Sequence, residues 1–143
     1  MRLILNRRTD YAIRALVGLA HDGSRRSARR IGQTMAIPAS FVGPVMADLT
    51  RAGLVHGIPG PAGGYRLARD ARSIVLRDVI EALEPSGGPE RCSLADRSCD
   101  PTAPCALHPI WGAASAAYLD TFGSATLATL AASDAASRQG GIR

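Results

Sequence analysis

With 143 residues, of which 46% are hydrophobic and 20% charged, the sequence is typical of a soluble globular protein of one domain, or of a small domain with an appendage. It contains neither a signal-peptide core nor a run of about 18 apolar residues, so we expect a cytoplasmic protein with no membrane partner. All seventeen basic residues are Arg: residues 1–77 hold thirteen against four Asp (net charge +9), and the remainder has four against eight acids (−4). This reversal of sign predicts that the N-terminal part binds a polyanion.

The first predicted helix covers residues 9–23. Apolar residues recur within it at helical spacing, at Ala12, Leu16, Leu19 and Ala20. Thr9 is suited to cap its N-terminal end, and Gly23 follows its C-terminal end. Asp10 falls in the first turn, where a carboxylate interacts favourably with the helix dipole.

Two shorter helices are predicted between residues 27 and 53. The first has Ser27 as its cap, with Ile31 and Met35 on one face. The second ends at Gly53 and places four apolar residues at helical spacing, namely Val42, Val45, Met46 and Leu49. Two short helices joined by a tight turn are typical of a helix-turn-helix, in which the second helix is presented outward.

Pro44 interrupts the second of these helices. Because its nitrogen cannot donate a hydrogen bond to the carbonyl of Ser40, either the helix kinks or it starts late, with Pro44 in its first turn. The sequence leaves both possibilities open.

A hairpin and a fourth helix complete the N-terminal part. In residues 54–70, an apolar pair, a segment rich in Gly and Pro, and the alternation of Tyr65 and Leu67 with Arg66 predict a β-hairpin wing. Helical spacing then returns before Pro85, at Leu76, Val79, Ile80 and Leu83. We therefore expect a mainly α fold with a small β-hairpin wing, and a winged helix-turn-helix DNA-binding domain over residues 1–84.

All three cysteines, Cys92, Cys99 and Cys105, fall in a segment that we delimit as residues 85–108. An odd number of cysteines in a reducing compartment argues against disulfides and for a metal, a cluster or redox chemistry. Thiolates are the usual ligands of iron-sulfur clusters. Zinc is an alternative, because His108 would complete a set of three Cys and one His, although the C-x2-4-C pair typical of structural zinc sites is absent.

Residues 109–132 are predicted to form a long dimerisation helix and a short terminal helix. Pro109 suits a first helical turn and Gly123 an end. Between them a seam at helical spacing consists of Trp111, Ser115, Tyr118 and Phe122. The seam would pack either against its own domain or against a second copy; we favour the second copy, because the cysteine segment separates this helix from the others. Residues 133–143 are expected to be a disordered tail.

In this order, these pieces resemble the winged-helix transcriptional regulators that bind iron-sulfur clusters, the family of IscR and NsrR. The stretches that carry the resemblance are MRL, TDYAIRAL, LTRAGLV, GPAGGYRL, DVIEALEP and the three-cysteine segment, and the first helix is most similar to that of the nitric-oxide-sensing repressor. The resemblance implies a non-enzymatic homodimer that binds a pseudo-palindromic operator in double-stranded DNA. It also implies that a 2Fe-2S or 4Fe-4S cluster controls the DNA affinity and senses nitric oxide, redox state or iron-sulfur status.

The cluster ligands implied by the resemblance are Cys92, Cys99 and Cys105, with six residues in place of the more usual five between the first two. For the fourth ligand, His108 matches the nitrogen ligand of IscR-like proteins, and Asp10 resembles the carboxylate that NsrR-like proteins donate from the opposite subunit. We favour Asp10, because RRTDYAIRAL matches over more residues. Either ligand holds iron less tightly than a thiolate does, which leaves one corner of the cluster open to attack.

The resemblance also implies a set of DNA-binding residues, namely Ser27, Arg29, Ser40, Arg51, Gly60 and Gly63. Ser40 matches a position from which relatives reach DNA, whereas Ser27 and Arg29 are suited to phosphates. Pro44 in the presented helix and Pro59 before the wing tip depart from the family pattern. They predict weaker base readout, with more reliance on phosphate contacts and DNA shape.

Two other functions remain open. The chain could be a DNA-binding regulator that uses its cysteines for zinc or thiol-redox sensing, or a small iron-sulfur electron carrier. The carrier offers no reason for the positive N-terminal part or the wing.

Overall fold

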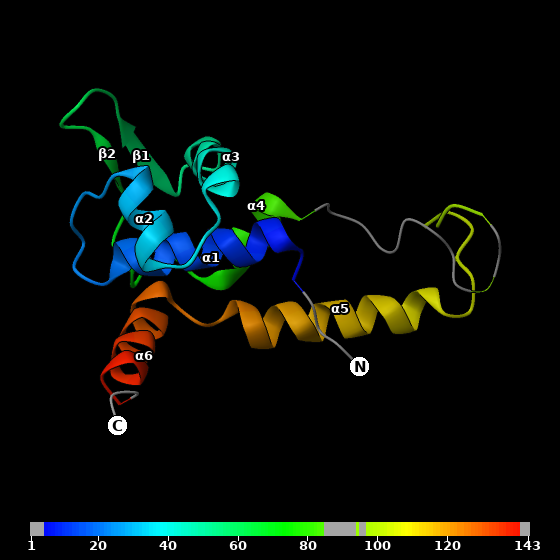
Figure 1. Cartoon of the computed structure of the whole chain (residues 1–143). Helices are drawn as coiled ribbons and strands as arrows, with labels where there is room; N and C mark the ends of the chain where they lie inside the picture. The colour runs from blue at the N-terminus through cyan, green and yellow to red at the C-terminus, as the bar shows by residue number, and fades with distance from the viewer. Residues whose placement is uncertain (1–4, 85–93, 95–96, 141–143) are drawn as a thin grey trace.

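Among the residues that the structure describes, the first helix begins directly after Asn6, and helices come both before and after one β-hairpin in the chain (Figure 1). The computed structural model of the protein describes residues 5–84, 94 and 97–140. In chain order the elements are α1 (Arg7–Ala20), α2 (Ala28–Thr34), α3 (Ala39–Arg51), β1 (Val55–Ile58), β2 (Gly64–Leu67), α4 (Leu76–Leu83), α5 (His108–Gly123) and α6 (Leu127–Gly140). The prediction of a mainly α fold with a hairpin wing is confirmed. None of the helices within the described ranges is long and apolar enough to cross a bilayer.

The cap of α1 differs from the prediction. The side chain of Asn6, and not that of Thr9, accepts a hydrogen bond at the N-terminal end, from the backbone nitrogen of Thr9 at 2.8 Å. Thr9 lies within the helix, where it is fully buried. Gly23 follows the helix in the left-handed region, with φ of +66°, as expected of a residue just beyond a helix end.

The helix-turn-helix forms as predicted. Ser27 caps α2 by accepting from the backbone nitrogen of Arg30 at 3.2 Å. In α3 the helix begins at Ala39, so Pro44 lies inside it and the late start is wrong. Gly53, with φ of +70°, follows the last turn. The apolar faces of α2 and α3 pack with α1 into one core, to which they contribute Ile31, Met35, Val42, Val45, Met46 and Leu49.

The wing is an antiparallel pair in which Val55 lies opposite Leu67 and Ile58 opposite Gly64. The segment before α2 extends it: Arg26 and Tyr65 exchange two backbone hydrogen bonds, of 2.9 and 2.8 Å. This pairing holds the start of α2 against the wing.

The C-terminal helix α6 is longer than predicted and belongs to the same core. It extends to Gly140, so the expectation of a disordered tail is wrong for residues 133–140. Leu127 and Ala131 are buried against α1, and the side chain of His21 lies 2.9 Å from that of Asp134. These tertiary contacts stabilise a helix whose Ala- and Ser-rich sequence has no strong apolar stripe.

Helix α5 projects from this body along the side opposite α2, α3 and the wing (Figure 1). It ends at Gly123, as predicted, and its C-terminal half packs against α4, where Arg77 pairs with Asp120 at 2.5 Å. Residues 109–117 are all exposed. Trp111 is 48% exposed, and the rings of Tyr118 and Phe122 stack at 5.2 Å. The aromatic seam therefore does not enter the core of its own domain.

Candidate functional site

The side of the molecule formed by α2, α3 and the wing presents polar groups at helix starts. Ser27, Arg29 and Ser40 are all exposed, and α2 packs against α3. The N-terminal end of a helix attracts anions because its backbone nitrogens lack intrahelical acceptors. Arg30, which the sequence reasoning did not single out, is also exposed in the first turn of α2. This surface suits contacts with phosphates.

The wing adds two exposed side chains that were missed. His56 and Arg66 lie directly opposite each other in the β1–β2 register, so their side chains share one face of the hairpin. The alternation of strand residues could have identified them once the register was known. Gly60 and Gly63 lie between the two strands: Gly60 has φ of +99°, and a Cβ atom on Gly63 would overlap the carbonyl oxygen of Ile58. Both glycines shape the tip.

Arg51 is not brought together with these groups. It lies in the last turn of α3, about 16 Å along the helix from Ser40. Its guanidinium pairs with one oxygen of Asp48, and the guanidinium of Arg8 on α1 pairs with the other. The hydrogen bond from Arg8, more than the charge of Arg51, holds the pKa of the Asp48 carboxyl below its ordinary value, although burial acts in the opposite direction.

Two of the predicted cluster ligands, Cys99 and His108, lie in contact. Cys92 is outside the described residues, whereas Cys99 and Cys105 are half-buried free thiols. The Sγ atom of Cys99 lies 3.3 Å from Nδ1 of His108. Side chains at about 2.3 Å (sulfur) and 2.0–2.1 Å (nitrogen) from one tetrahedral metal would be about 3.6 Å apart, so this pair needs little movement to share a metal.

Local hydrogen bonds make this contact possible. A carboxylate oxygen of Asp100 accepts from the backbone nitrogen of Thr102 at 2.8 Å and from its hydroxyl at 2.7 Å, which closes a turn. The Thr102 hydroxyl is the main cause of a lowered pKa at Asp100. The backbone nitrogen of His108 then donates to the carbonyl of Cys105 at 3.0 Å. The chain thereby returns His108 to Cys99 at the start of α5.

Asp10 lies elsewhere. It is on α1, where its carboxylate pairs with Arg14 at 2.9 Å, whereas Cys99 and Cys105 come just before the N-terminal end of α5, which points away from α1 (Figure 1). Among the described residues, no three Cys, His, Asp or Glu side chains converge as a metal site within one chain.

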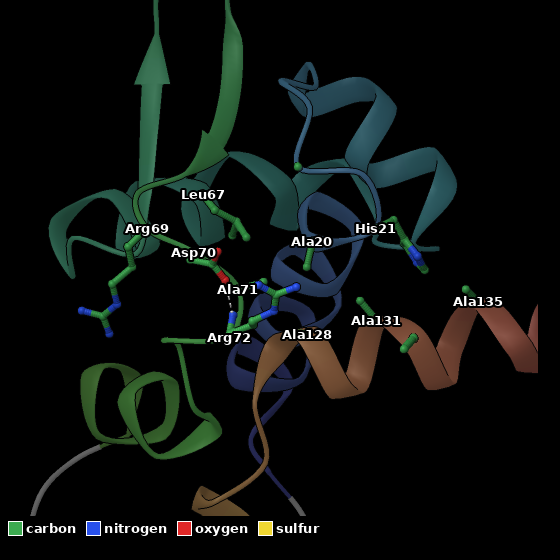
Figure 2. Close-up of a pocket in the computed structure, with 12 residues that line it drawn as sticks. Ala20, His21, Leu67, Arg69, Asp70, Ala71, Arg72, Ala128, Ala131 and Ala135 are labelled. Carbon is green, nitrogen blue, oxygen red and sulfur yellow. Dashed lines mark hydrogen bonds between the residues drawn. The ribbon is translucent and has the colours of Figure 1, made fainter.

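A hollow of about 530 Å³ opens between the end of α1, the segment after β2, and α6 (Figure 2). Six alanines line it together with a few polar residues, which include His21, Asp70 and Arg72. A carboxylate oxygen of Asp70 accepts a hydrogen bond from the backbone nitrogen of Arg72 at 2.7 Å. The hollow contains none of the predicted site residues.

Residues 5–133 match the Rrf2 family, described as "Iron-dependent Transcriptional regulator". The chain is 33% identical over 128 residues to "Protein rrf2" of Nitratidesulfovibrio vulgaris, which covers 88% of this chain and 85% of the relative. Its fold is similar to that of IscR from T. potens, with a TM-score of 0.73, 25% identity and coverage of 93% of this chain and 88% of the other. It is also similar to CymR, the global cysteine regulator of B. subtilis, with a TM-score of 0.71, 25% identity and coverage of 92% and 98%.

Proposed function

Because the chain belongs to the Rrf2 family of transcriptional regulators, which are not enzymes, we propose that it is a dimeric DNA-binding regulator whose DNA affinity is controlled by an iron-sulfur cluster. The contact between Cys99 and His108 at the start of α5 carries the proposal. It brings together a thiol and an imidazole, both of which bind iron.

DNA binding rests on the side formed by α2, α3 and the wing. Ser27 and Arg29 bind phosphates beside the start of α2, and Ser40 reaches base edges from the start of α3. Arg66 extends the phosphate contacts onto the wing. A two-fold dimer would present two such surfaces to half-sites about 34 Å apart, and the net charge of the N-terminal part predicts a steep loss of affinity with salt.

Dimerisation rests on α5. Its exposed stretch carries Ile110 and Trp111, with Tyr118 and Phe122 farther along, and large apolar groups in such number seldom remain uncovered on one helix. Burying each could contribute about 2 kcal/mol. The occupant that we propose is α5 of a second copy, which gives the two-fold symmetry that a palindromic operator requires.

The cluster would be held by Cys92, Cys99 and Cys105, with His108 as the fourth ligand. The observed contact supports His108, and Asp10 of the partner subunit is the alternative. When bound, an iron-sulfur cluster supplies an iron site that nitric oxide, oxidants or iron loss can attack. His108 begins α5 and so ties the cysteine segment to the proposed dimer helix. Release of His108 would free that end of α5 and alter the placement of the two winged domains.

A second candidate function follows from the same contact. Oxidants could act directly on the Cys99 thiol, or the same donors could hold zinc. The fold is shared with the cysteine regulator CymR.

The test is anaerobic purification of the full chain, followed by visible absorbance, iron and sulfide analysis, and gel-shift assays on duplexes from upstream of its own operon. We expect a brown protein whose cluster-loaded and cluster-free forms bind DNA with different affinities. A colourless protein with stoichiometric zinc would favour the second candidate. A chain that shifts no duplex in either form would refute the regulator itself.

A further inference from the structure

Asp48 is a buried carboxylate in an otherwise apolar face of α3. Its side chain is 4% exposed, and its neighbours on that face, Val45, Met46 and Leu49, are buried apolar residues. Both carboxylate oxygens are used: Arg8 binds one from the first turn of α1, and Arg51 binds the other from the last turn of α3. A carboxylate in such a place is costly unless it is paired, so this arrangement depends on both arginines.

The ion pair between Arg8 and Asp48 restricts a rotation of α3 that the surrounding apolar contacts allow. Apolar packing is non-directional and tolerates small rotations of a helix about its own axis, whereas hydrogen bonds to a carboxylate are directional. The bond from Arg8 crosses from α1 to α3 and therefore opposes rotation of α3 against the rest of the core.

Small rotations matter at the other end of the helix. A side-chain tip about 5 Å from the axis moves by about 1 Å when the helix rotates by about 10°. Hydrogen bonds to base edges tolerate only about half of that displacement. Ser40 lies on the same helix, about 12 Å along the axis from Asp48.

We propose that Asp48 is a positioning residue for DNA recognition, which fixes the rotation of α3 through Arg8 so that Ser40 meets the bases, while Arg51 pairs with its other oxygen from within α3. This inference rests on the proposed function. It also gives Arg51, which the sequence placed among the DNA-binding residues, a role away from DNA.

The test compares specific with non-specific binding. Wild-type full-length protein selects its preferred duplex from a random library, and the affinities for this duplex and a scrambled duplex are then measured for each variant. Asp48→Asn should lower the affinity for the selected duplex by about tenfold and leave the scrambled duplex unaffected, a loss on the scale of one specific base contact. Asp78→Asn is the matched control, because it removes the same charge from an ion pair, with Arg69 at 2.6 Å, that does not involve α3.

Arg8→Gln keeps the test decisive if Asp48→Asn fails to fold, because the Arg8 side chain is 54% exposed and the pair between Asp48 and Arg51 remains. It should also lower the ratio of specific to non-specific affinity. If it weakens both duplexes equally, the ion pair between Arg8 and Asp48 does not position Ser40 and the inference is wrong. An unchanged ratio in a folded Asp48→Asn protein likewise overturns it. If the wild type selects no sequence at all, the proposed function itself fails and takes the inference with it.

Discussion

The Sγ atom of Cys99 and the Nδ1 atom of His108 meet at 3.3 Å although the two residues are nine positions apart in the chain. The turn at Asp100 and the start of α5 produce this contact, which joins the cysteine segment to the projecting helix. The first prediction tests what the contact is for.

Replacing any one of Cys92, Cys99 and Cys105 by Ala should abolish cluster binding, because each removes a thiolate ligand. His108→Ala should leave a cluster with altered visible absorbance that bleaches faster under nitric oxide, since a weaker ligand then replaces the imidazole. Asp10→Ala is the control and should leave both properties unchanged. If Asp10→Ala alone changes the spectrum, the fourth ligand is the partner's carboxylate; if all three cysteine variants keep the cluster, the sensing mechanism is wrong.

Tyr118→Glu combined with Phe122→Glu should convert the dimer to a monomer. The two stacked rings lie on one face of α5, and two carboxylates there would oppose burial against a second copy. Light scattering gives the mass, with Ala116→Glu, an exposed position on the other side of α5, as the control. A double variant that remains dimeric would place the interface elsewhere.

Arg29→Ala should weaken binding to all duplexes alike and reduce the salt dependence by about one phosphate contact. Ser40→Ala should instead change the preference among sequences, because it removes a group that reaches base edges. Arg72→Ala removes the same charge as Arg29→Ala from an exposed residue at the α1–α6 hollow and should have little effect (Figure 2). Equal losses of DNA affinity for Arg72→Ala and Arg29→Ala would mean that binding depends on the overall charge of the protein and not on the position of Arg29.

The ion pairs of Asp48 predict a pH dependence of stability. Since its folded pKa is lowered, the pairs stabilise the protein above the unfolded pKa of about 3.9, and this contribution is lost as the pH falls through the folded pKa. Urea unfolding at pH 7 should therefore show Asp48→Asn to be less stable than wild type by about 2 kcal/mol. The difference should shrink below about pH 4. A difference that stays constant with pH would mean that the lost stability does not come from the charge.

Leu127→Ala should lower the free energy of unfolding by about 3 kcal/mol, because Leu127 is fully buried at the start of α6. Leu130→Ala, at a partly buried position of the same helix, should cost less. Equal and small losses in urea unfolding would show that α6 is dispensable for the core.

Local signals predicted the winged domain well and the C-terminal helices only in part. Apolar residues at Leu16, Ile31 and Val79 recur with clear helical periods, and Ser27 has the chemistry of a cap, so these elements follow from neighbouring residues alone. The true cap of α1, Asn6, was missed because Thr9 is also a good capping residue.

Features that depend on distant residues could not be predicted. The extent of α6 depends on contacts with α1 that lie more than 100 residues back in the chain, such as His21 with Asp134. The pairing of Asp48 with Arg8 is equally remote, and Arg51 binds the other oxygen of the same carboxylate. The contact of Cys99 with His108 depends on a turn that spacing alone does not reveal.

The return of α6 onto α1 has a consequence for the order of folding. His21 at the end of α1 lies 2.9 Å from Asp134, and Leu127 fills the core beside residues of α1, so α1 is covered by a helix that is synthesised more than 100 residues later. Contacts of such long sequence separation form late, because a long loop must close first. Until α6 has been synthesised, part of the apolar face of α1 stays open to chaperones and to other nascent chains.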